Sequence, residues 1–364
     1  MTALNALRLT SWNRRSIDPL FASRSPKTLE VEAVLAGRTA GSLYVDHAEN
    51  PQAAALNIGV GWHVVGRPSP DFLRAINRLL PRDTYSVLIL PDDQADAWLP
   101  TLTEDLYFVR ARSRYAARTQ VAVPEPPCPE GYRVEAIDQA LLEHDVEGIE
   151  GIREEILGTW HSLDDFLADG FGFVVLSESC IVGHSMTDYV CGDACEIGVF
   201  VDEGHRLKGL GSLVATRTAD EAFARGLRRV GWMSWACNHG SVAVSLNAGF
   251  SDVCKYDIYI NHWPAENPSD LTQEEFQTFA EEYEARFAEH PPVDSGYPHI
   301  VAATAWALAG NGQKCRAQLR NAINMRWLTS VAQLKTLWPE LFTAPDLQER
   351  KPWAELLALL EWEA

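Results

Sequence analysis

The sequence predicts a mixed α/β protein with a helical C-terminal part. An apolar, strand-like segment at 197–201 runs into a glycine-bearing turn, and a helical pattern starts at Ser212. Strand-like runs bounded by turn residues recur through the first 121 residues. From Pro264 onward, helical patterns replace them. We therefore expect a central mixed sheet flanked by helices, followed by an all-helical tail.

Length and local composition divide the chain into four parts. A chain of 364 residues is long enough for two or three domains that each bury a core. Residues 122–131 are rich in proline, which indicates a stiff linker between domains. We expect a smaller α/β companion domain at 1–121, a second α/β domain at 132–263 and a helical domain at 264–364.

The companion domain contains five strand-like runs and one helical run, at 70–80. The strand-like runs are 42–45, 53–60, 62–65, 85–90 and 106–115. The domain has no Walker motif and no cluster of catalytic residue types. One interpretation is that it is a degenerate relative of the second α/β domain.

The second α/β domain starts with a strand at 132–136 and a mostly helical stretch at 138–156. A short helix at 160–170 follows, in which Ser162 and Asp165 have the spacing of a capping box. A hairpin at 171–189 and a turn at 192–193 then lead into the strand that carries Glu196.

Helical patterns fill the tail, at 271–290, 300–308, 314–325, 330–338 and 353–362. Residues 303–324 resemble a tetratricopeptide-type helix pair, in which Gly310 ends the first helix. Because a solenoid needs several stacked repeats, one pair is better interpreted as a packing or dimerising cap. A homodimer is therefore one expectation.

Charge and cysteine content exclude several classes of function. A net charge of −19 argues against nucleic-acid and anionic-membrane partners. It would favour a cationic substrate, although an acidic surface that merely keeps the protein in solution is the better interpretation. We see no signal peptide and no membrane-spanning stretch. Seven irregularly spaced cysteines fit reduced thiols in the cytoplasm.

The turn after residue 201 has the composition of an anion-binding site. Arg206, Gly209 and Gly211 form the pattern Arg-x-x-Gly-x-Gly directly before a helix, where backbone N–H groups are free to bind an anion. A purely structural glycine turn gives the same letters. A second motif follows in register, with Asn238 and Ser241 in a turn and Gly-Phe at 249–250. Together the two motifs resemble the GNAT (GCN5-related N-acetyltransferase) superfamily.

The resemblance implies the GNAT fold and acetyl-CoA as co-substrate. In the family, backbone groups at the positions of Phe200 and Val201 bind pantetheine. The pyrophosphate would be held by the loop residues, mostly through amide N–H groups. These residues are Arg206, Leu207, Lys208, Gly209, Leu210, Gly211 and Ser212. No metal is implied, since Cys191, Cys195, His184 and His205 match no common zinc spacing.

Two residues occupy the family's catalytic positions. Glu196 stands where several GNAT enzymes keep a general base, and its apolar neighbours could raise its pKa. The alternative is a structural glutamate. Ser245 stands where the family has a tyrosine that protonates the leaving thiolate. A serine hydroxyl is a poor acid, so an ordinary helix residue is at least as good an interpretation.

The remaining candidates line the expected ligand sites. Asn238 is either a structural residue or a contact to CoA, whereas Ser241 is better interpreted as the helix cap. Trp160, His161 and Asp165 lie in the segment that lines the acceptor cleft in this fold. An aromatic face beside carboxylates would suit an ammonium group.

The layout as a whole resembles the GNAT branch that includes the zwittermicin A resistance acetyltransferase. That resemblance implies acetyl transfer to the primary amine of a small molecule such as an antibiotic, by direct attack within a ternary complex. Two alternatives stay open. One is a protein acetyltransferase that docks its target on the helical tail, and the other is an acyl-CoA sensor or scaffold without turnover.

Overall fold

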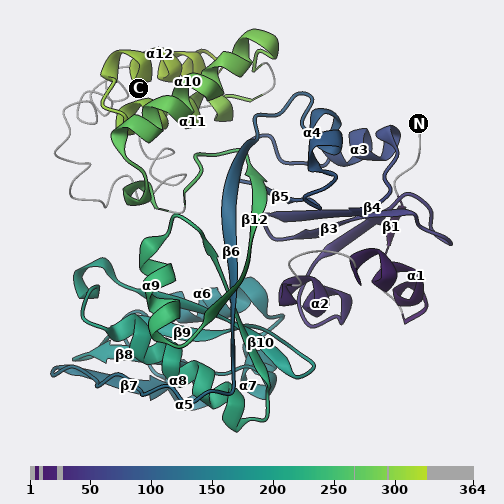
Figure 1. Ribbon diagram of the computed structural model, residues 1–364. Coiled ribbons are helices and arrows are strands. Elements are labelled where there is room, and N and C mark those ends of the chain that lie inside the picture. The colour runs from purple at the N-terminus through teal and green to yellow at the C-terminus, as the bar shows by residue number, and fades with distance from the viewer. Residues whose placement is uncertain (1–4, 8–10, 23–27, 266, 293–294, 326–364) are drawn as a thin grey trace.

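The computed structural model describes residues 5–7, 11–22, 28–265, 267–292 and 295–325. In this part of the chain, twelve strands form one sheet in the order β1-β2-β3-β4-β5-β12-β6-β11-β10-β9-β8-β7. Helices pack on the sheet, and a helical region follows its last strand (Figure 1). The predicted fold class is confirmed.

The N-terminal half, residues 5–119, contains every strand that the sequence predicted there. Its elements are β1 (Asn5–Leu7), α1 (Ser11–Ala22), α2 (Leu29–Leu35), β2 (Ser42–Val45), β3 (Ala53–Ile58), β4 (Gly61–Gly66), α3 (Pro70–Asn77), β5 (Val87–Ile89), α4 (Ala95–Leu102) and β6 (Val109–Thr119). The expectation of a single helix was wrong, because α1, α2 and α4 are also helical. α1 and α4 contain an internal proline and α2 is only seven residues long, so none gives a clear helical period.

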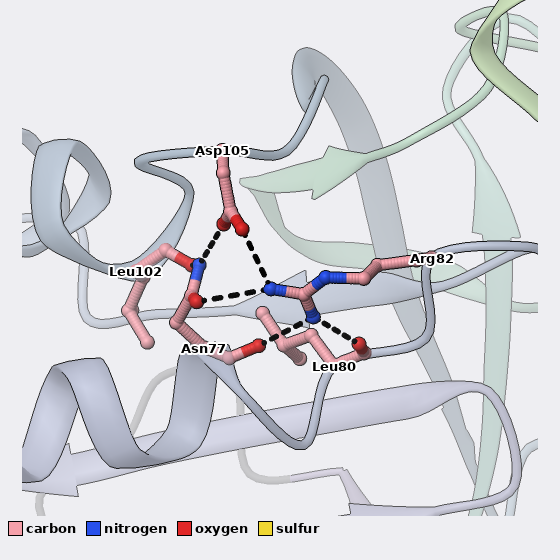
Figure 2. A network of polar contacts seen from close by, with 5 residues as sticks. All are labelled: Asn77, Leu80, Arg82, Leu102 and Asp105. Atoms are coloured by element: carbon pink, nitrogen blue, oxygen red, sulfur yellow. Dashed lines mark hydrogen bonds and ion pairs between the residues drawn. The ribbon is translucent and has the colours of Figure 1, made fainter. Parts of the chain in front are cut away.

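A polar network fixes the connection between α3 and α4 (Figure 2). The side-chain amide of Asn77 donates to the carbonyl of Leu102 and to the carboxylate of Asp105, both at 2.9 Å. Arg82 donates to Asp105 at 2.8 Å and to the carbonyl of Leu80 at 3.1 Å. The buried amide is therefore satisfied, and both helices are held over the apolar face of β3 and β4.

The C-terminal half, residues 132–260, follows the predicted order of elements as far as Phe250, and the strand after it was not predicted. They are β7 (Tyr132–Ala136), α5 (Gln139–Glu143), α6 (Ile149–Thr159), α7 (Leu163–Asp169), β8 (Gly172–Ser177), β9 (Cys180–Cys191), β10 (Ala194–Val201), η1 (Glu203–His205), α8 (Leu210–Ala224), β11 (Arg229–Trp235), α9 (His239–Asn247) and β12 (Ser251–Ile260). The proline-rich segment before β7 contains no helix or strand.

The two halves share their central strands. β4 and β5 are parallel neighbours in the N-terminal half, as β10 and β11 are in the C-terminal half. Next to β5, however, lies β12 from the C-terminal half, and next to β11 lies β6 from the N-terminal half. β6 and β12 pair with each other and run side by side through the middle of the molecule (Figure 1). The sheet thus crosses the predicted domain boundary, and each half contributes one parallel strand pair to it.

The helical region comprises η2 (Pro268–Asp270), α10 (Gln273–Glu289), α11 (Tyr297–Leu308) and α12 (Gly312–Asn324). These helices match the first three predicted in the tail, whereas those at 330–338 and 353–362 lie outside the described residues. α11 is buried along its whole length and packs in one core with Tyr107 and Trp263. No helix in the described ranges has both the length and the apolar character needed to cross a membrane.

Candidate active site

The site lies where two parallel strands diverge. β10 and β11 are neighbours only over 194–196 and 229–231. Beyond that point β10 stays paired with β9 as far as Val201, and β11 stays paired with β6 as far as Trp235. The facing edges therefore carry backbone N–H and C=O groups that the sheet does not use, and these groups can bind an extended ligand.

A cavity of about 1500 Å³ opens at this divergence and is lined by both halves. Its described lining has seven acidic residues and no lysine or arginine. The acidic residues are Glu30, Glu147, Glu154, Glu155, Asp188, Glu196 and Asp202. Aromatic side chains also line it, among them Tyr85, Tyr189, Trp235 and Tyr256. Negative charge beside aromatic faces is a suitable environment for an ammonium group.

The loop that ends β10 leads into α8, as the sequence predicted. Gly209 is the N-cap of α8 with a φ of +83°, and Leu207 also has a positive φ, of 62°. Both conformations are of the left-handed kind that often turns consecutive N–H groups toward an anion. The first N–H groups of α8, from Leu210 to Ser212, have no partner within the helix.

Side chains tie this loop to the strands around it. Arg206 Nε donates to the carbonyl of Val201 at 3.0 Å. Lys208 Nζ donates to the Tyr132 hydroxyl at 2.8 Å, and His205 Nδ1 lies 2.9 Å from the same hydroxyl. The loop is thus fixed before any ligand binds, and its N–H groups and two basic side chains suit a pyrophosphate. The residues present fit the acetyl-CoA that the sequence predicted.

Glu196 faces the cavity from β10 and is 3% exposed. Its Oε1 accepts a hydrogen bond of 2.6 Å from the backbone N–H of Leu29, and the Tyr115 hydroxyl lies next to it. Burial, followed by the charge of Glu30, raises the pKa of Glu196 to about 8. Its carboxylate can therefore accept a proton at neutral to alkaline pH.

Asp188 is a second carboxylate in the cavity, and the sequence analysis missed it. It is the extra residue of a β-bulge in β9, because Glu196 pairs with Tyr189 whereas Ile197 pairs with Thr187. Its carboxylate lies across Gly198, where an added Cβ would be 3.0 Å from Oδ1. Burial, then the charge of Glu155, raises the pKa of Asp188 to about 8. The sequence feature that could have revealed Asp188 is a carboxylate within a strand-like segment.

Ser245 lies away from the cavity in the described structure. It is completely buried on α9, where its Oγ accepts from Arg114 Nη1 at 2.9 Å and donates to the carbonyl of Val242 at 2.9 Å. It is not one of the cavity-lining residues. These contacts give Ser245 a packing role, and its role as an acid stays a prediction.

Asn238, and not Ser241, caps α9. The Asn238 side chain accepts from the backbone N–H of Ser241 at 2.9 Å, so the expectation of a Ser241 cap was wrong. An asparagine that directly precedes a helix readily accepts a hydrogen bond from the backbone N–H of the third helical residue. The Ser241 hydroxyl instead accepts from Trp232 Nε1 at 3.0 Å and lines the cavity.

The three predicted acceptor residues separate in space. Trp160 lines the cavity, and its Nε1 donates to the carbonyl of Thr187 at 2.9 Å. His161 and Asp165 are exposed and are not in the cavity lining. Asp165 instead completes the start of α7, where its N–H and its carboxylate both bind the Ser162 hydroxyl. No cluster of three metal-ligating side chains occurs in the described part of the chain.

The two residues that the sequence predicts to bind pantetheine, Phe200 and Val201, lie at the end of β10. Phe200 lines the cavity, is 48% exposed and stacks on His184 with ring centroids 5.8 Å apart. Burial lowers the pKa of His184 to about 4, so this ring is neutral at physiological pH. The strand end thus offers an apolar, uncharged surface beside its free backbone edge.

Comparison with known proteins agrees with this geometry. The family model of the GNAT acetyltransferases matches residues 18–259. The chain belongs to the GNAT acetyltransferase family. The match spans both halves of the sheet and ends before α10. The protein is therefore an acetyltransferase, from a family that uses acetyl-CoA.

Two proteins similar to this GNAT protein match about the same share of the chain. The "Uncharacterized N-acetyltransferase YdfB" of Bacillus subtilis is 23% identical over 258 residues, which cover 69% of this chain and 97% of the relative. The solved GCN5-related N-acetyltransferase-like protein of Streptococcus suis is 21% identical, with a TM-score of 0.55. That alignment covers 68% of this chain and 97% of the other. At this level of identity, the structural similarity shows a common fold and no more.

Proposed function

We propose that this GNAT protein transfers the acetyl group of acetyl-CoA to a primary amine of a small cationic molecule. The observation that carries the proposal is the acidic, aromatic cavity that opens onto the gap between β10 and β11. An ammonium acceptor would be attracted by the carboxylates and packed against the aromatic rings. A cationic metabolite or antibiotic fits this description.

Acetyl-CoA supplies an activated thioester to the site. The N–H groups of the Arg206–Ser212 loop would hold its pyrophosphate, and the free edge at Phe200 and Val201 would bind pantetheine. Direct attack forms the new C–N bond as the C–S bond breaks, within one ternary complex. Glu196 or Asp188 would take the proton from the ammonium, a role supported by the position of both residues in the cavity lining.

The shape of the cavity favours a small acceptor over a protein substrate. Residues of the N-terminal half, including Glu30, Val60 and Tyr85, line the cavity together with residues of α6 and β10. The reacting amine would therefore bind between the two halves. A compact amine would then be enclosed by both halves, as small-molecule ligands commonly are in their pockets.

The first experiment measures acetyl-CoA binding by calorimetry. In Gly209→Trp the new side chain points into open space above the loop, since an added Cβ meets no atom within 4 Å. Gly226→Trp is the matched control, because Gly226 has a φ of +89°, is equally open and lies at the far end of α8. We expect saturable binding in the parent and in Gly226→Trp, and its loss in Gly209→Trp.

Release of CoA is then followed with mono-, di- and polyamines and with alcohols of similar size. Turnover restricted to amines, and faster with the more cationic ones, is the expected result. Binding of acetyl-CoA without turnover on any amine would replace the enzyme with a sensor or scaffold. Absence of binding by the folded parent protein would refute the proposal that the Arg206–Ser212 loop holds the pyrophosphate.

A further inference from the structure

We propose that the N-terminal half takes part in the reaction, with Leu29 and Glu30 at the start of α2 acting as positioning residues for Glu196. The inference rests on the proposed function, in which Glu196 accepts a proton from the acceptor amine. It gives the N-terminal half a role in catalysis that the sequence did not indicate, since no catalytic motif occurs there.

The first observation is the hydrogen bond from Leu29 to Glu196. The backbone N–H of Leu29 lies 2.6 Å from Oε1 of Glu196, and the two residues are 167 positions apart in the chain. Leu29 is the first residue of α2, so its N–H has no acceptor within the helix. Glu196 provides that acceptor from the other half, and the bond fixes one carboxylate oxygen.

The second observation is the placement of Glu30. Its carboxylate lines the same cavity and is only 14% exposed. The Thr28 hydroxyl donates to Glu30 Oε1 at 3.2 Å, and His63 Nε2 lies 3.0 Å from the same oxygen. The N-terminal half therefore holds a negative charge close to another buried carboxylate. The charge of Glu30 raises the pKa of Glu196, so the two carboxylates are coupled across the halves.

Groups from five strands and two helices act on Glu196 or on the residues beside it. Leu29 and Glu30 on α2, Asp188 on β9 and Tyr115 on β6 act on Glu196 itself. The charge of Glu196 in turn acts on Tyr189 on β9, Cys195 on β10 and Tyr256 on β12. Glu155 on α6 acts on Asp188, and Arg229 on β11 acts on Tyr115. Beyond burial, the charges of Glu30 and Asp188 raise the pKa of Glu196, while the Leu29 N–H and the Tyr115 hydroxyl lower it. Leu29 and Glu30 thus act in opposite directions, which makes the proposal testable.

Two variants separate these actions. Glu30→Gln removes the negative charge but keeps an oxygen for Thr28 and His63, so the carboxylate form of Glu196 should persist to lower pH. Leu29→Pro removes the Leu29 N–H at a position where helices tolerate proline. It also removes a buried leucine side chain, a loss that Leu29→Ala reproduces while keeping the N–H. Thr28 is already extended, with φ −70° and ψ 147°, as a residue before proline prefers. Without that N–H, the carboxylate form of Glu196 should require higher pH.

The assay is the pH profile of kcat/KM for acetyl transfer to spermidine, from about pH 5 to about pH 10. For Glu30→Gln we expect the acid limb to move down by on the order of one pH unit, which is about a tenfold gain on that limb. For Leu29→Pro the limb should move up. Leu29→Ala, which keeps the N–H, and Asp71→Asn, an exposed pair with Arg74 in the same half, should keep the parent midpoint.

An infrared titration of the protonated carboxyl band that disappears in Glu196→Gln gives the same midpoints without turnover. Shifts of this band in opposite directions in the two variants support the proposal, even if spermidine is not an acceptor. Unchanged midpoints in Glu30→Gln, or a lower thermal stability with no shift, would reduce α2 to a structural support. Absence of parent turnover with every amine of the panel, with the band shifts intact, would instead overturn the proposed function.

Discussion

Gly231 provides a direct test of how tightly β11 is fitted to Glu196. It is the residue of β11 that pairs with Glu196 on one side and with Ala117 of β6 on the other. A Cβ at this position would lie 2.6 Å from Cγ of Glu196 and 2.7 Å from the Tyr115 hydroxyl oxygen. Gly231→Ala therefore places a methyl group where no space exists.

The size of the effect follows from these distances. Ordinary contacts of a Cβ begin at about 3.4 Å, so Glu196 and Tyr115 must each move by roughly 1 Å. Strain of this kind in a packed interior costs about 1–3 kcal/mol. A displacement of about 1 Å at a catalytic group costs roughly 100-fold in rate. We expect both effects, because the same methyl group strains the sheet and displaces Glu196.

The assay combines urea denaturation with kcat for acetyl transfer. Gly204→Ala is the matched control, because an added Cβ there meets nothing within 4 Å and its φ is not positive. Gly231→Ala should lose stability and most of its kcat, whereas Gly204→Ala should keep its stability. Parental kcat and parental stability in Gly231→Ala would refute the close packing of β11 on Glu196.

Three further predictions concern stability. Because the pKa of Glu196 is raised from 4.5 to about 8, its contribution to stability is complete below about pH 4.5 and is lost as the pH rises through 8. The stability of Glu196→Gln relative to the parent, measured by urea midpoints, should therefore increase from acid to alkaline pH. A stability difference that does not change with pH would contradict this. Ser245→Ala should lose about 1–3 kcal/mol by urea denaturation, because Arg114 loses a buried partner; a large loss of kcat at unchanged stability would restore the predicted acid role. Asn77→Ala should also lose about 1–3 kcal/mol, since it breaks the network around Asp105, and a melting temperature equal to that of the parent would refute it.

Local patterns were sufficient to predict most elements of the fold. Alternating apolar residues gave the strands, and the glycines at 209 and 211 marked the turn into α8. The helices α1, α2 and α4 were missed, because an internal proline or a length of seven residues hides their period. The exchange of β6 and β12 between the halves was equally hidden. Strand neighbours are decided by long-range packing, which a local pattern does not encode.

For the candidate site, the sequence by itself determined the loop from Arg206 to Ser212 and the position of Glu196 on its strand. These follow from local spacing, because a strand, a glycine turn and a helix are consecutive in the chain. Only the tertiary structure decided the partners of Glu196. Leu29 comes from α2, and Asp188 enters the cavity through a β-bulge. A contact across 167 residues and a shift in strand register depend on how the halves pack, and that packing brings the carboxylates into one cavity.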